Sequence, residues 1–130
     1  MHHHRLGGLP ITEFKINCEV AAWCRNNLSE TVIFYHIPNG ANNPIRGAKE
    51  KAMGVLRGTP DLFFFWNGQS AWIELKTGKG RLSTYQHEFF SKVENNGGRI
   101  ALCRSLDEVK NVLKEWQVPL AKKEKPRFDF

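Results

Sequence analysis

The chain has 130 residues, of which 41% are hydrophobic and 25% charged. This length and composition are typical of one globular domain with a single core, and they exclude a fibrous or low-complexity protein. No apolar run is long enough to cross a bilayer and no signal peptide is visible, so we expect no membrane partner. The formal net charge of +6 favours a polyanionic partner such as nucleic acid, with a solvated basic surface as the alternative.

The domain boundaries follow from composition. Met1 is followed by three histidines, so residues 1–10 are predicted to be a disordered or tag-like N-terminus. Residues 11–118 form the predicted domain, and residues 119–130 a loose basic C-terminal tail. Three cysteines show neither a CxxC pair nor a histidine at zinc-like spacing. No disulfide framework is implied, which fits a reducing, cytoplasmic compartment.

The first predicted helix carries one unexpected acid. Thr12 is a candidate cap for this helix, which is predicted to run to about Asn26. Its buried stripe is marked by apolar residues at helical spacing: Ile16, Val20 and Trp23. Glu19 falls on or beside that stripe, where burying an unpaired carboxylate is costly. Glu19 is therefore a candidate functional acid, and an exposed acid on the helix flank is the alternative.

A strand and a polar segment follow. Residues 31–37 are rich in branched and aromatic side chains and are predicted to form a strand that ends in a turn. His36 and Asn39, at that turn, are candidates for contact with nucleic acid. His36 is also a candidate general base, although a histidine at a strand end more often bonds a neighbouring loop. Asn39 alternatively stabilises its own turn with Gly40. Residues 41–58 are predicted to hold a short helix around residues 48–53, and they include Arg57 as a further candidate contact.

The next segment is a hairpin with a defined register. Asn67-Gly68 is the strongest short-range hairpin signal, and a two-residue loop there makes Asp61 face Glu74. Directly opposed residues have Cβ atoms about 5 Å apart and share a face of the sheet. Lys76, two residues after Glu74, points to the same face. Two adjacent carboxylates repel each other unless a cation lies between them, so the register predicts a divalent metal site.

The chemistry of this constellation points to phosphodiester hydrolysis. Asp61 and Glu74 supply oxygen ligands, the Leu75 backbone carbonyl a third, and such ligands suit Mg²⁺ or Mn²⁺. Lys76 has no acceptor and instead positions the attacking water or faces the charge that develops on phosphorus. Glu19 would close the site from the first helix. The alternative is a sheet-surface salt bridge between Lys76 and a nearby acid.

The rest of the chain adds a basic loop and two capped helices. Residues 77–82 form a Gly-rich loop from which Lys79 and Arg81 project, and both are candidate phosphate contacts. Ser83 and Gln86 match a capping box and open a helix that Gly97-Gly98 ends. A strand over 99–103 and a helix that begins at Ser105 complete the predicted order, which is helix, strand, two-stranded hairpin, helix, strand, helix.

These motifs together resemble the VRR-NUC branch of the PD-(D/E)XK nuclease superfamily. The resemblance is carried by Gly58-Thr59-Pro60-Asp61, by Ile73-Glu74-Leu75-Lys76-Thr77-Gly78, by Arg81-Leu82-Ser83 with Gln86, and by Gly97-Gly98 before residues 99–103. It implies an α/β fold: a single-domain, restriction-endonuclease-like αβββαβ core with a mixed central sheet flanked by helices.

The resemblance also implies roles for the site residues. Asp61 and Glu74 would bind the metal, and Lys76 would orient the nucleophile. Glu19 would assist at the metal through water, and Gln86 would support the site from the following helix, although its capping role explains it equally well.

The expected function is that of an Mg²⁺- or Mn²⁺-dependent endodeoxyribonuclease. Stand-alone members of this branch resemble dimeric Holliday-junction resolvases, which implies branched DNA as substrate, a homodimer, and the cytoplasm of a bacterial or phage-infected cell. Two alternatives stay open. One is a nucleic-acid-binding module without turnover, and the other is a nuclease that acts on non-junction DNA or on RNA.

Overall fold

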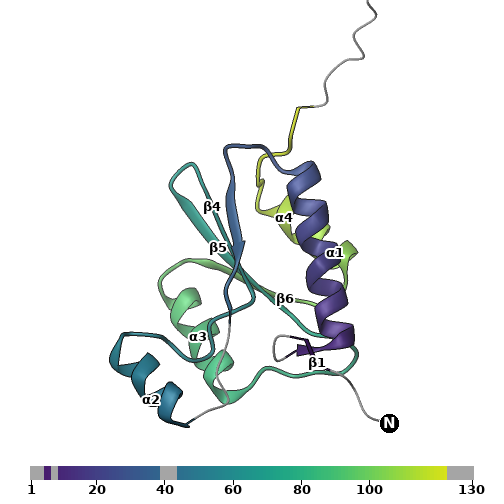
Figure 1. Cartoon of the computed structure of the whole chain (residues 1–130). Coiled ribbons are helices and arrows are strands. Elements are labelled where there is room, and N and C mark those ends of the chain that lie inside the picture. Colours follow the sequence, from purple (N-terminus) through teal and green to yellow (C-terminus); the bar gives the residue numbers. More distant parts are fainter. Residues whose placement is uncertain (1–4, 7–8, 39–43, 123–130) are drawn as a thin grey trace, which may run out of the picture.

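The computed structural model describes residues 5–6, 9–38 and 44–122. The three histidines after Met1, Asn39, and residues 123–130 of the predicted basic tail lie outside the described residues. The described chain contains six strands and four helices (Figure 1): β1 (Arg5–Leu6), β2 (Leu9–Pro10), α1 (Ile11–Asn27), β3 (Ile33–His36), α2 (Pro44–Ala52), β4 (Leu62–Trp66), β5 (Gln69–Leu75), α3 (Thr84–Asn95), β6 (Arg99–Cys103) and α4 (Leu106–Glu115).

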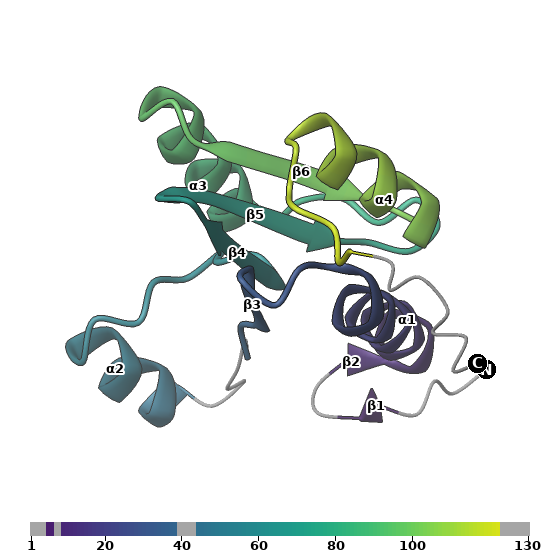
Figure 2. The ribbon, with the colours of Figure 1, turned by 90° about the horizontal axis from the view of Figure 1, so that it is seen from above.

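A mixed four-stranded sheet forms the centre of the molecule. Its strand order is β3-β4-β5-β6, in which the β3–β4 and β4–β5 pairs are antiparallel and the β5–β6 pair is parallel. Helices α1 and α4 lie together on one side of the sheet and α3 on the other, while α2 stands apart near β3 (Figure 2). The predicted αβββαβ core with a mixed sheet and flanking helices is confirmed, and α2 is inserted between β3 and β4.

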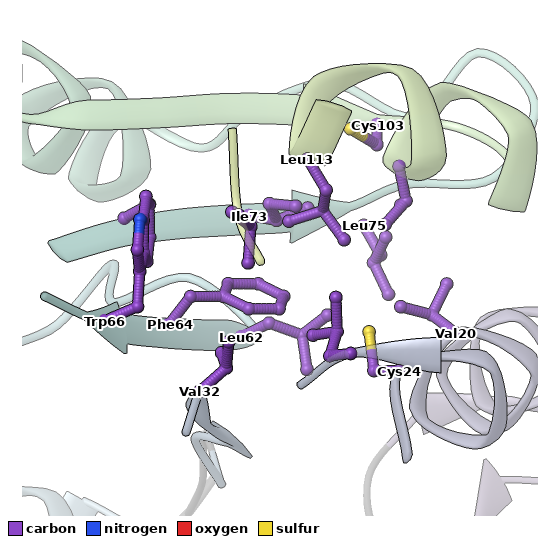
Figure 3. Close-up of a cluster of buried hydrophobic side chains, with 14 of the residues drawn as sticks. Val20, Cys24, Val32, Leu62, Phe64, Trp66, Ile73, Leu75, Cys103 and Leu113 are labelled. Carbon is purple, nitrogen blue, oxygen red and sulfur yellow. The ribbon is translucent and has the colours of Figure 1, made fainter. Parts of the chain in front are cut away.

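The hydrophobic core fills the space between the sheet and the α1–α4 pair (Figure 3). Phe64 of β4 and Ile73 of β5 are fully buried there, because alternate residues of a strand point to the same face. Val20 of α1 and Leu113 of α4 cover them from the helix side. At about 25 cal/mol per Å² of apolar surface removed from water, this layer supplies most of the favourable free energy of folding.

The β4–β5 hairpin has the register that its turn predicted. Asn67 and Gly68 have positive φ angles of 44° and 73°, the backbone that a two-residue primed turn requires. Trp66 therefore pairs with Gln69, and Phe64 pairs with Ala71. The same register continues past the start of β4 and places Asp61 opposite Glu74.

The N-terminal predictions need correction. Residues 1–10 were expected to be disordered or tag-like, but β1 pairs with β2 in an antiparallel ladder. Helix α1 begins at Ile11, directly after Pro10, so Thr12 lies inside its first turn and is not its cap.

Candidate active site

Two buried acids lie side by side at the open end of the β4–β5 hairpin. Asp61 immediately precedes β4 and is 7% exposed, and Glu74 lies in β5 and is 2% exposed. Both belong to the sheet face that α3 covers, opposite the apolar core. Their burial excludes the alternative of an exposed surface salt bridge, since a charge taken out of water is costly unless it is paired.

Asp61 is held by backbone groups of two neighbouring strands. Its Oδ2 accepts a hydrogen bond of 2.7 Å from the Leu75 N–H. Its own carbonyl accepts one of 2.7 Å from Ile37, the residue after β3. The N–H and C=O of one strand residue point to the same side, so the Leu75 carbonyl is directed toward Asp61. This direction suits the Leu75 carbonyl as a third oxygen ligand.

One side-chain oxygen of Glu74 accepts a hydrogen bond and the other does not. Its Oε2 accepts a hydrogen bond of 3.1 Å from Gln86 Nε2, whereas its Oε1 is buried without a hydrogen-bond partner. A buried polar atom without a partner costs free energy, and such atoms in folded proteins mark a strained site or the position of a ligand. The orphaned Oε1 beside Asp61 is therefore the atom that a bound cation would satisfy.

The electrostatics of the pair lead to the same conclusion. Burial first, and then the charge of the neighbouring Asp61 and a side-chain hydrogen bond with it, together raise the pKa of the Glu74 carboxyl to about 9. The Lys76 ammonium opposes this increase, and Glu13 adds to it. Without a cation, Glu74 therefore keeps a proton at neutral pH. A divalent ion between the two carboxylates would let both ionise, and their oxygen chemistry fits Mg²⁺ or Mn²⁺.

Gln86 caps α3 and also donates a hydrogen bond to Glu74. Its Oε1 accepts from the Ser83 N–H at 2.8 Å while its N–H donates to Ser83 Oγ at 3.2 Å, which completes the predicted capping box of α3. Because the amide oxygen is committed to Ser83, the amide nitrogen is turned toward Glu74. The helix cap thereby orients the side chain that bonds the buried acid.

Gly58 fixes where the first turn of α3 sits. A Cβ on Gly58 would lie 2.3 Å from the Tyr85 carbonyl oxygen and 2.8 Å from the Gln86 nitrogen, and the Gly58 φ angle is +83°. Arg57, next to it, places its guanidinium 4.1 Å from the Tyr85 ring centroid. The Tyr85 ring stays 45% exposed beneath this guanidinium.

Lys76 leaves the sheet beside the acid pair. Its N–H donates to the Cys103 carbonyl at 3.1 Å, and its side chain is half-buried. Gly80 lies against that side chain, since a Cβ there would be 3.5 Å from Lys76 Cδ. The Arg104 guanidinium bonds the Gly78 carbonyl at 2.8 Å and holds the same turn. The turn thus packs on the aliphatic part of the Lys76 side chain. The Lys76 ammonium opposes the rise in the pKa of Glu74.

Glu19 of helix α1 is exposed, which matches the alternative of an acid on the helix flank and not a place on the buried stripe. Its role at the metal stays a prediction. The acid of α1 whose charge acts on Glu74 is Glu13, in the first turn of the helix. Helical periodicity identifies the buried face but not the turn that reaches the site. The signal for Glu13 was its position near the helix start, six residues before Glu19.

The predicted nucleic-acid contacts are distributed unevenly. Lys79 and Arg81 are exposed on the loop beside Lys76, and Arg57 is exposed at the first turn of α3. His36 pairs with Leu62 and therefore belongs to the sheet face opposite the acid pair. Asn39 lies outside the described residues.

Comparison with known proteins supports the same assignment. The profile of the VRR-NUC domain family matches residues 10–107. The chain belongs to the VRR-NUC family. This family is part of the PD-(D/E)XK nuclease superfamily, so the matched region is a nuclease domain of that type.

A solved structure described as a VRR_NUC domain protein has the same fold, with a TM-score of 0.67 and 21% sequence identity. The match covers 83% of this chain and 90% of that one. No curated protein sequence matches the chain.

Among the described residues, no group of three or more His, Cys, Asp or Glu side chains is arranged to hold a metal ion. None of the described helices is both long and apolar enough to span a membrane.

Proposed function

We propose that this VRR-NUC domain is a divalent-metal-dependent endonuclease that hydrolyses phosphodiester bonds in DNA. The observation that carries the proposal is the buried Glu74 Oε1, which has no hydrogen-bond partner and lies beside a second buried carboxylate. Asp61, Glu74 and the Leu75 carbonyl would hold Mg²⁺ or Mn²⁺. When bound, the ion would supply a Lewis acid for the phosphate and a more acidic water.

The protein's own groups account for positioning. Lys76, whose stem packs against the turn at Gly80 and whose charge acts on Glu74, would orient the attacking water and stabilise charge on the phosphate. Gln86 keeps Glu74 in place. Glu13 is the α1 acid that we assign to the site, in the position first expected for Glu19, and it would act on the metal through water.

The basic loop would hold the substrate backbone. Lys79 and Arg81 are exposed next to Lys76 and would contact phosphates on either side of the scissile bond. A pure binding module would need these cations but not two buried acids beside a lysine. The acid pair therefore favours a nuclease over a non-catalytic DNA- or RNA-binding protein.

The decisive test is cleavage by Asp61→Asn. This variant keeps an oxygen that accepts from the Leu75 N–H but loses the charge that a cation requires. It should reduce Mg²⁺- and Mn²⁺-dependent cleavage by about a thousandfold or more without changing the thermal midpoint by much. Glu115→Gln, an exposed acid at the end of α4, is the matched control and should cleave normally. Full activity of Asp61→Asn would reject the proposal.

We further propose branched DNA, such as a four-way junction, as the substrate and a homodimer as the active form. A symmetric pair of sites would cut two strands of a junction together. A panel of junction, flap, duplex, single strand and RNA, assayed with sedimentation at the same protein concentration, tests this part. Preference for duplex or RNA, or symmetric resolution by a monomer, would contradict it.

A further inference from the structure

The segment formed by α2 and the turn after it, residues 44–57, is called the wing below. Figures 1 and 2 both show α2 separated from α1 and α4, and Figure 2 shows it beyond the β3 edge of the sheet. The turn that follows α2 is well defined, because the Gly54 N–H bonds the Lys51 carbonyl at 3.0 Å and the Val55 N–H bonds the Glu50 carbonyl at 2.9 Å. Gly54 has the positive φ of +94° that this helix-ending motif requires.

The wing exposes large apolar side chains at high density. Met53 is 76% exposed, and Val55 and Leu56 are each about half exposed. Ile45, at the start of α2, is 70% exposed. Scattered apolar residues on a surface need no explanation, but a cluster within twelve residues of sequence marks a binding surface.

The same segment is strongly basic. Lys49 and Lys51 are exposed on α2, and Arg57 is exposed where the wing ends. The single acid of the wing is Glu50, which is paired with Arg46 at 3.3 Å. Apolar side chains surrounded by cations fit an anionic partner that also presents flat apolar surfaces. Nucleic acid with accessible bases has both properties.

The base of the wing is tied to the active site. Arg57 stacks on Tyr85, and Gly58 touches the backbone of Tyr85 and Gln86. Gln86 in turn bonds Glu74. The base of the wing is therefore connected to the acid pair through Gln86.

We propose that the wing recognises opened DNA. Its lysines contact phosphates, and Met53, Val55 and Leu56 pack on bases that are unpaired or unstacked at a branch, flap or end. An uninterrupted duplex offers phosphates and groove edges but no free base faces, so it engages only the charges. This inference rests on the proposed function, because it names the class of DNA that the same site acts on.

Binding by matched variants tests the inference. All proteins carry Asp61→Asn to prevent cleavage, and the probes are a four-way junction, a flap and a plain duplex in EDTA. The apolar variant Met53→Ser/Val55→Ser/Leu56→Ser should weaken junction and flap binding about tenfold or more, and duplex binding less than about twofold. Its control is Leu120→Ser, which changes an exposed leucine far from α2 and should bind as the background does.

The charge of the wing is tested separately. Lys49→Gln/Lys51→Gln should weaken binding to all three probes and reduce the slope of log affinity against log salt by about 2. Lys92→Gln/Lys114→Gln removes the same charge from the last turns of α3 and α4 and should change the slope much less. Thermal melting confirms that each variant is as folded as the Asp61→Asn background, which is expected because every side chain altered in addition to Asp61 is exposed.

The outcomes separate this inference from the proposed function. If wild type cleaves no DNA but the apolar variant loses junction and flap binding, the function fails and the wing assignment stands. If the apolar variant binds all three probes as the background does, the inference is overturned whether or not wild type cleaves. A change in sedimentation without a change in DNA affinity would also overturn it, because the wing would then be a contact between copies of the chain.

Discussion

At the turn end of the β4–β5 hairpin, Phe64 opposes Ala71 and both are fully buried, whereas at the open end Asp61 opposes Glu74. One register, set by Asn67 and Gly68, produces both pairs. The apolar pair stabilises the fold. In the acid pair, the pKa of Glu74 is raised and Glu74 Oε1 has no hydrogen-bond partner. The apolar turn end thus stabilises a hairpin whose open end holds two neighbouring carboxylates, an arrangement that is unfavourable unless a cation lies between them.

The largest effect on stability should come from the turn end. Phe64→Ala removes a side chain with no exposure and leaves a cavity between the sheet and α1, so it should lower the free energy of unfolding by about 3–5 kcal/mol. Urea unfolding measures this change. Phe65→Ala, at the next residue along the strand, which is exposed, is the control and should lower the free energy of unfolding much less. Equal losses would contradict the assignment of the two faces.

The acid pair at the open end of the β4–β5 hairpin should make the metal-free protein less stable as the pH rises. Glu74 has a folded-state pKa of about 9, above its unfolded value of 4.5, so the folded state retains a proton that the unfolded state releases. Its contribution is fully present below the unfolded pKa and is lost as pH rises through the folded pKa, with a slope of at most about 1.4 kcal/mol per pH unit.

Urea unfolding in EDTA at about pH 5.5 and about pH 8.5 measures this dependence. Glu74→Gln removes the titrating group and should flatten it, and Mn²⁺ should flatten it in the wild type. A wild-type protein whose stability in EDTA is as high at the upper pH, with Glu74→Gln behaving identically, would argue against the buried, protonated acid.

The contact between Gly58 and the backbone of α3 can be tested by comparing two glycine variants. Gly58→Ala should destabilise the protein by about 1–3 kcal/mol more than Gly97→Ala and should also reduce cleavage. Both glycines have positive φ, but only a Cβ on Gly58 meets backbone, at Tyr85. The Gly97 variant isolates the cost of the φ angle alone. Similar stability and activity in the two variants would show that the contact does not position Gln86.

The smallest effects concern the two helix caps. Ser83→Ala and Ser105→Ala each remove a hydroxyl that accepts a hydrogen bond at the start of a helix, and each should cost about 1 kcal/mol. Only Ser83 belongs to the cap that orients Gln86, so only its loss should also lower the rate of cleavage. If the two variants are equally stable and cleave DNA at equal rates, the Ser83 cap does not position Gln86 for cleavage.

The sequence predicted the parts of the site that depend on local geometry. A two-residue loop fixes register, so the opposition of Asp61 and Glu74 followed from Asn67 and Gly68 alone. The capping box of Ser83 and Gln86 is equally local.

Contacts between distant segments could not be predicted in this way. Helical spacing gave the buried face of α1 but did not indicate that the charge of Glu13, in the first turn, would act on Glu74. Nothing in the spacing of α3 indicated that Arg57 would stack on Tyr85, or that Gly58 would pack on its backbone. Such contacts depend on how the elements dock.

Calorimetric titration with Mn²⁺ tests most directly whether the acid pair is a metal site. Wild type should bind the ion, and both Asp61→Asn and Glu74→Gln should lose at least about tenfold in affinity, because each removes one of the two charged ligands. Glu19→Gln should bind as wild type does, since Glu19 is exposed, while Glu13→Gln should bind more weakly. Unchanged Mn²⁺ affinity in Asp61→Asn and Glu74→Gln would contradict the assignment of a metal site to this end of the hairpin.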